Sequence, residues 1–127
     1  DLCLRILMHL EEDGIEPLFI LWALSRECRL LASLAFELNQ GKNLTTLFKE
    51  HALWEKRQHL YQHALTRHSI THWYQLLGFA RYIDQLIKGI DSGNVWNALQ
   101  LFCLTIAAPS DNNTFFDRFC NEMAGAP

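Results

Sequence analysis

The clearest chemical cluster of this 127-residue sequence lies at residues 54–57. A tryptophan is followed within three positions by two cations, in the order Trp54, Lys56 and Arg57. At the start of a helix, such a cluster can stack a nucleobase on the indole and hold a phosphate with the cations and the free backbone N–H groups. The alternative is a tryptophan at the edge of a hydrophobic core with solvated cations beside it. The sequence leaves both possibilities open.

A second group of aromatic and cationic residues lies within segment 17–39. Trp22, Arg26, Arg29 and Phe36 fall on one face of the helix predicted there, opposite its apolar stripe. Tryptophan and arginine are enriched where proteins bind one another. This face is therefore a candidate contact for a partner protein or for nucleic acid. The alternative is a central helix that its neighbours cover on all sides.

The sequence contains six histidines, and two pairs of them are four residues apart. His59 and His63 form the first pair, and His68 and His72 form the second. Two histidines at this spacing can bind one metal ion from one face of a helix. Neither pair has HExxH spacing or an obvious third ligand. We therefore expect exposed polar histidines and no metal site.

Sequence motifs for catalysis or nucleotide binding are absent. The sequence contains no GxxxxGK[ST], GxGxxG or GxSxG pattern. The neighbouring acids Glu11, Glu12 and Asp13 mark the end of a helix and do not resemble a catalytic pair. The sequence predicts a chain without catalysis, cofactor or metal.

Segment 17–39 is also the helix that must position these groups. Pro17 suits a first helical position, and Gly41 suits a residue just past the end. About 23 residues at 1.5 Å each span roughly 35 Å, the width of a small domain. Apolar residues recur at steps of three and four, which predicts one buried stripe. They are Leu21, Leu24, Cys28, Leu31, Ala35 and Leu38.

Other helices are predicted over residues 2–12, 44–52, 53–67, 69 or 71 to about 90, and 95–107. No stretch alternates long enough for a strand. We expect an all-α single domain over residues 1–127, with about six helices bundled around the long central one. Residues 108–127 are expected to form a loop and a weakly ordered tail, with one short helical turn over 115–123. Arg57 falls inside an apolar stripe and needs an acceptor, for which Glu27 is a candidate.

Composition narrows the choice of partner and compartment. Half of the residues are hydrophobic and the net charge is −3, so any nucleic-acid contact must be local. No apolar run is long enough to span a membrane. The cysteines at positions 3, 28, 103 and 120 form no CxxC pair, which predicts buried free thiols in a reducing, cytoplasmic compartment. The chain starts at Asp1 in helical register, as expected for a piece of a longer protein.

Three runs resemble the C-terminal domain of the delta subunit of bacterial DNA polymerase III. They are LWALSRECRLLASL (Leu21 to Leu34), LWEKRQHLYQHALTR (Leu53 to Arg67) and NVWNALQLFCLTIA (Asn94 to Ala107). The second run resembles the Trp-x-x-Arg helix of that family. The order and spacing of the runs also match, so the resemblance covers about residues 1–107.

The resemblance implies a helical collar that holds together the pentameric clamp loader, which places the sliding clamp on primed DNA. It implies AAA+-like modules upstream of the chain and no ATP hydrolysis by this part. The implied partners are clamp-loader subunits of the gamma/tau and delta prime type, with primed DNA in the assembled complex. The subunit interface would then include Trp22, Arg26, Arg29 and Phe36. Trp54 and Arg57 would face the template. A free-standing helical adaptor that binds a partner helix is the alternative function.

Overall fold

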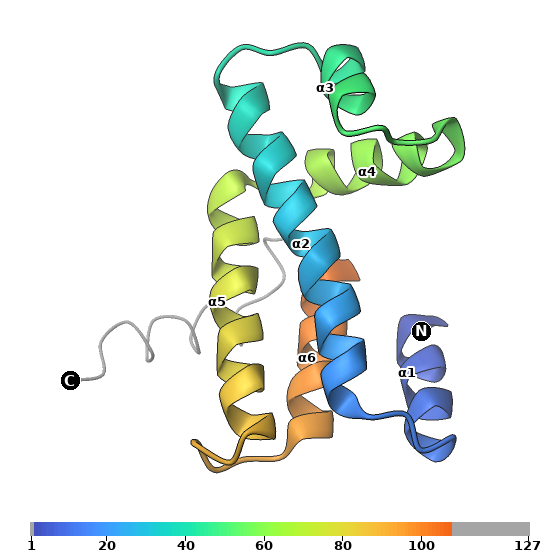
Figure 1. Ribbon diagram of the computed structural model, residues 1–127, viewed down its shortest axis with the longest axis vertical. Coiled ribbons are helices and arrows are strands. Elements are labelled where there is room, and N and C mark those ends of the chain that lie inside the picture. The colour runs from blue at the N-terminus through green and yellow to red at the C-terminus, as the bar shows by residue number, and fades with distance from the viewer. Residues whose placement is uncertain (1, 108–127) are drawn as a thin grey trace, which may run out of the picture.

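The computed structural model describes residues 2–107, which form six α-helices and contain no strand (Figure 1). The helices are α1 (Leu2–Glu12), α2 (Pro17–Asn39), α3 (Leu44–Glu50), α4 (Glu55–Arg67), α5 (Ile70–Ile87) and α6 (Val95–Ala107). The predicted all-α bundle is confirmed. The loop, tail and helical turn expected over 108–127 lie outside the described residues.

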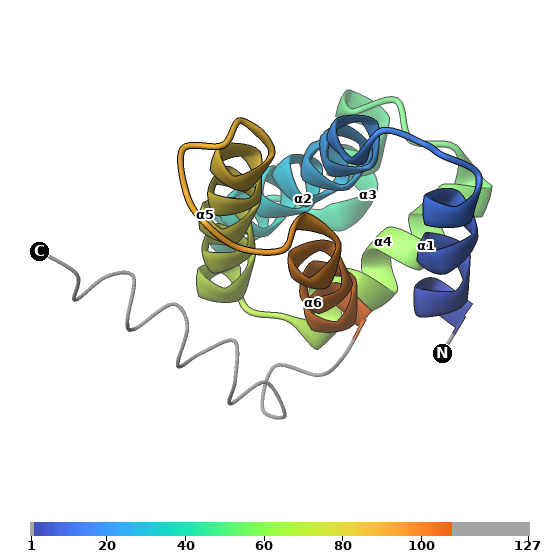
Figure 2. The ribbon, with the colours of Figure 1, turned by 90° about the horizontal axis from the view of Figure 1, so that it is seen from below.

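The centre of the bundle consists of α2, α5 and α6. In the view from below, these three helices lie at the corners of a triangle (Figure 2). α5 packs against both α2 and α6, and α1 packs on α6. α3 and α4 lie toward the C-terminal end of α2 (Figure 1). The largest fully buried side chains fill the space between these helices. They include Leu34, Leu47, Trp73, Leu76, Ile83, Leu99 and Phe102.

The predicted stripe of α2 faces this core. Leu21, Cys28, Leu31 and Ala35 are buried, and Leu24 and Leu38 pack against the core from its edge. Cys28 and Cys103 are buried and form no disulfide within residues 2–107, as predicted. Burial raises the pKa of Cys28 to about 12, which keeps this thiol protonated and unreactive.

α5 ends earlier than the expected residue near 90. Gly89 has a φ of 76°, its N–H bonds to the carbonyl of Leu86, and the N–H of Ile90 bonds to the carbonyl of Gln85. This is the Schellman arrangement, in which a left-handed glycine closes the helix. Ile90 is consequently 70% exposed and does not continue the buried stripe of α5.

α3 and α4 are also shorter than predicted, because the backbone turns sharply at Ala52. Ala52 has a φ of 53°, a conformation that costs a non-glycine residue about 1–2 kcal/mol. The N–H of Leu53 reaches back to the carbonyl of Phe48, which closes α3. α4 therefore begins at Glu55, with Trp54 as its N-cap.

None of the helices in residues 2–107 combines the length and the apolar character needed to cross a lipid bilayer.

Candidate functional site

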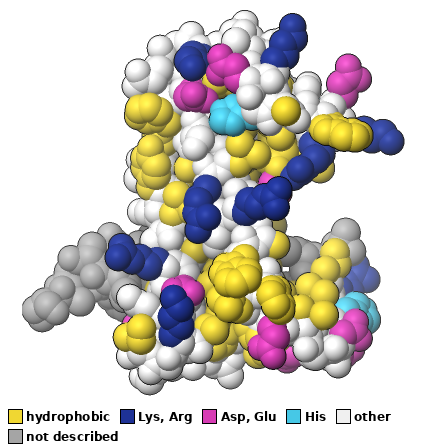
Figure 3. Space-filling view, in the orientation of Figure 1, with side chains coloured by type: hydrophobic (Ala, Val, Ile, Leu, Met, Phe, Trp, Pro, Cys, Tyr) yellow, Lys and Arg dark blue, Asp and Glu magenta, His cyan; other side chains and the backbone are white. Residues whose placement is uncertain are grey.

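The aromatic and cationic face of α2 is open to solvent. Trp22 and Phe36 are 55% and 47% exposed, and Arg26 and Arg29 are exposed between them. The ring of Phe19 meets that of Trp22 edge-on, with 5.6 Å between centroids. Figure 3 shows Lys and Arg side chains across the middle of this surface, with hydrophobic side chains gathered beside and below them. The alternative of a central helix covered on all sides is therefore wrong for the isolated chain.

A groove runs along the seam between α2 and α5. It consists of two hollows that share Arg29 and Leu77 in their linings. The α2 wall includes Trp22 and Phe36, and the α5 wall adds Tyr74 and Arg81. We call these six residues, together with the floor between them, the α2–α5 groove.

The α5 wall of this groove was not anticipated from the sequence. Tyr74, Leu77 and Arg81 follow one another at steps of three and four. This spacing indicates one helix face, but only the packing of α5 on α2 shows that this face borders the candidate interface.

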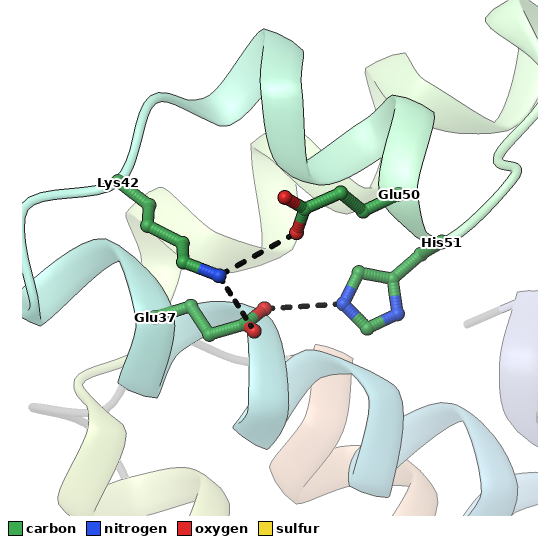
Figure 4. Close-up of polar contacts among 4 residues, drawn as sticks. All are labelled: Glu37, Lys42, Glu50 and His51. Carbon is green, nitrogen blue, oxygen red and sulfur yellow. Dashed lines mark hydrogen bonds and ion pairs between the residues drawn. The ribbon is translucent and has the colours of Figure 1, made fainter.

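Glu37, which lines one end of the groove, belongs to a polar cluster (Figure 4). Glu37 lies 3.1 Å from Nε2 of His51 and 3.5 Å from Nζ of Lys42. Lys42 also lies 3.6 Å from Glu50. The hydrogen bond from His51 and the charge of Lys42 lower the pKa of Glu37. Glu37 is thus a carboxylate that is already paired within the chain, with residues that join α2 to α3.

Along the rest of the groove, the acidic residue has an ion-pair partner among the described residues and the arginines do not. Asp84 borders the groove and lies 2.8 Å from Nζ of Lys88, one turn further along α5. Arg29 and Arg81 form no ion pair with any residue in 2–107. Both acids of the groove are therefore engaged internally, while both arginines keep an uncompensated charge.

The Trp54 cluster forms a second open site. Trp54 is 79% exposed and precedes the first turn of α4, which carries the exposed cations Lys56 and Arg57. The alternative of a tryptophan at the edge of the core is therefore wrong. Trp54 also makes no side-chain hydrogen bond to the start of the helix that it caps.

Arg57 ties α4 to α2. Its Nη2 lies 2.7 Å from Oε1 of Glu27, as expected from the sequence, and 2.5 Å from the hydroxyl oxygen of Tyr61. The hydroxyl of Tyr61 donates a hydrogen bond to Oε2 of Glu27. Burial and the adjacent carboxylate raise the pKa of Tyr61 to about 12, so this donor keeps its proton. The three side chains fix the first turns of α4, and with them the position of Trp54.

The histidine pairs behave differently from each other. His59 and His63 are exposed, as expected. His68 and His72 are each 4% exposed, which contradicts the expectation of exposed polar histidines. Their rings stack with 4.1 Å between centroids. No group of three metal-binding side chains lies anywhere in the described part of the chain.

The buried histidines and a neighbouring arginine contact the last backbone carbonyls of α6. Nε2 of His68 lies 2.8 Å from the carbonyl oxygen of Ile106, and Nε2 of His72 lies 3.4 Å from that of Thr105. Arg67 donates a hydrogen bond to the carbonyl of Ala107. The last carbonyls of a helix have no partners within it, so this cluster has a structural explanation. Residue spacing within α4 and α5 gave no sign of it.

The cluster predicts a loss of stability in mild acid. Burial lowers the pKa of His68 from its usual value of 6.5, and the charges of His72 and Arg67 act in the same direction. The unfolded chain therefore binds more protons than the folded chain below pH 6.5, and the free energy of unfolding falls there. His68→Gln, which keeps a donor for Ile106, should reduce this fall in denaturant titrations at pH 8 and about pH 5.5. His59→Gln is the exposed control, and an equal fall in all three proteins would contradict the prediction.

Comparison with known proteins identifies relatives of the chain. The sequence model of the family described as "Processivity clamp loader gamma complex DNA pol III C-term" matches residues 2–110. DNA polymerase III subunit delta of Escherichia coli (strain K12) is 29% identical over 114 residues, which cover 90% of this chain and 33% of that protein. The chain thus spans about a third of the length of this curated relative. No solved structure matches the chain significantly.

Proposed function

The chain belongs to the family of C-terminal domains of the clamp-loader delta subunit, and from this membership we propose that its helices form a collar that joins the loader's subunits. In this role the domain performs no catalytic step. Its partners are clamp-loader subunits of the gamma/tau and delta prime type. The complete subunit then acts within a loader that places a sliding clamp on primed DNA.

The observation that supports the collar best is the open face of α2. Trp22 and Phe36 expose about half of their surface, and Arg26 and Arg29 lie between them on the same face. Aromatic residues and arginines of this kind supply most of the binding energy at protein interfaces. Neighbouring helices of the chain leave this face uncovered, so it is available to a sister subunit.

Reversing two charges on this face tests the proposal. In the complete delta-type subunit, Arg26→Glu with Arg29→Glu should weaken assembly with the sister subunits at least tenfold, or about 1.4 kcal/mol. The physical reason is that reversed charges oppose any partner that complements the arginines. Sedimentation velocity with purified subunits measures the effect.

Lys49→Glu provides the matched control, because Lys49 is an exposed cation on α3 away from this face. Circular dichroism establishes that each variant is folded. Unchanged assembly of a folded double variant would refute the collar interface. If the subunit instead migrates alone in every mixture, the adaptor alternative gains support.

A second proposed role is contact with template DNA in the assembled complex. Trp54 is 79% exposed beside the cations Lys56 and Arg57. Arg57 is already paired with Glu27, so Lys56 and the N–H groups at the start of α4 are available to hold a phosphate while Trp54 stacks a base. The net charge of −3 gives the isolated chain little attraction for DNA. We therefore expect the contact to matter only when the assembled loader holds the DNA against α4.

A further inference from the structure

The α2–α5 groove has the dimensions of a binding site for one helix. Its lining extends from Leu21 to Glu37 along α2. At 1.5 Å per residue these positions span about 24 Å, which matches a partner helix of roughly 16 residues. Arg29 and Leu77 belong to both halves of the lining, so the two hollows are adjacent along the seam.

The floor of the groove is mainly apolar, with the buried Ser25 also among its lining residues. Leu21, Ala32 and Ala80 line its base, and all three are buried within the bundle. A partner that lies here must bring its own apolar side chains into contact with them. An amphipathic helix does this with residues at steps of three and four.

The charged residues of the groove predict the charge of the partner. Glu37 is engaged by His51 and Lys42, and Asp84 is engaged by Lys88. Arg29 on α2 and Arg81 on α5 both line one hollow and have no ion pair among residues 2–107. Complementary charge on a partner would therefore be negative.

We infer that the α2–α5 groove binds an amphipathic helix of a sister subunit whose apolar stripe is flanked by Asp or Glu residues. The apolar stripe covers Leu77 and the floor, and the acids pair with Arg29 and Arg81. This inference rests on the proposed collar function and adds to it the second wall of the interface and the chemistry of the partner. Nucleic acid would satisfy the arginines but would leave the apolar floor exposed to polar backbone.

Site-specific cross-linking identifies the occupant directly. The complete subunit carrying Tyr74→p-benzoylphenylalanine is assembled with purified gamma/tau-type and delta prime-type subunits, irradiated and analysed by mass spectrometry. We expect a cross-link to one sister subunit, within a helical segment that has an apolar stripe and flanking acids. A cross-linked segment without acids, or one from a second copy of this chain, would overturn the inference.

A parallel cross-linker at Phe19, which is on α2 outside the groove lining, separates this inference from the collar itself. A cross-link from position 19 but none from position 74 means that α2 binds a subunit while the groove does not hold its helix. An assembled pentamer with no cross-link from either position counts against both proposals.

Arg81 provides the test of charge. Arg81→Glu should weaken assembly at least tenfold, whereas Arg81→Lys should stay within a factor of about three, because the positive charge remains. Lys49→Glu, on α3, is again the control for an unrelated reversal. If Arg81→Glu lowers the affinity of the loader for primed DNA and leaves assembly intact, the groove binds nucleic acid and the inference fails.

Discussion

Replacing Trp54 with Asn should weaken binding of the assembled loader to primed DNA and, at the same time, stabilise the domain. Stacking of a base on an aromatic side chain contributes about 1–3 kcal/mol, so the affinity should fall about 5- to 150-fold. The free energy of unfolding should rise by about 1 kcal/mol, because Asn is a strong N-cap. Weaker DNA binding by a more stable domain could not be explained by partial unfolding.

Three other helices of the chain, α3, α5 and α6, support the second half of this prediction, whereas α2 also begins without a side-chain cap hydrogen bond. The side chain of Asn43 accepts a hydrogen bond of 2.8 Å from the N–H of Thr45. Ser69 and Asn94 cap α5 and α6 in the same way. Trp54 has no such group and makes no such bond. A residue that departs from the local rule while remaining exposed is expected where function requires it.

Leu60 offers a matched control for Trp54, because it is also on α4 and is 69% exposed. Leu60→Asn should leave DNA affinity unchanged. Fluorescence anisotropy with a labelled primed template measures binding of the assembled loader, and urea denaturation of the 127-residue chain measures stability. Equal DNA affinity of the wild-type protein and Trp54→Asn would refute the template contact, whatever the stability result.

Local sequence rules predicted much of the scaffold. Pro17 and Gly41 bound α2 as their sequence positions suggested, and Asn43 and Asn94 cap α3 and α6, which is the position that asparagine prefers. These rules act over a few residues, so they can be applied to a sequence directly. Where they were misapplied, the errors were equally local: Gly89 was overlooked as the end of α5.

Predicting the candidate sites would have required knowledge of how the helices pack against one another. The periodicity of α2 placed Trp22 and Arg29 on one face, but could not decide whether another helix covers it. Arg81 became part of the groove only once α5 was docked on α2. The burial of His68 depends on the end of α6, 38 residues further along the chain. Ala52 adopts a left-handed conformation that propensity disfavours, because the closed end of α3 and the start of α4 require it.

Replacing Phe102 with Ala should lower the free energy of unfolding by about 3–5 kcal/mol. Phe102 is completely buried on α6, and its ring meets that of Phe79 on α5 with 5.9 Å between centroids. Truncation leaves a cavity between these helices and removes the aromatic contact. Leu104→Ala is the control on the same helix, where a side chain that is 37% exposed should cost much less. Urea denaturation of both variants measures the difference.

The same variant distinguishes loss of folding from loss of binding to the sister subunits. A domain in the middle of the usual stability range of about 5–15 kcal/mol stays folded at low temperature after a loss of about 3–5 kcal/mol, with its α2 surface unchanged. The complete subunit carrying Phe102→Ala should therefore assemble normally in the cold and fail only on warming, as the domain unfolds. The Arg26 and Arg29 reversals should weaken assembly at every temperature, since they alter the contact itself. If Phe102→Ala abolishes assembly while the domain is still folded, the interface must depend on α6, and the assignment of binding to the face of α2 would be wrong.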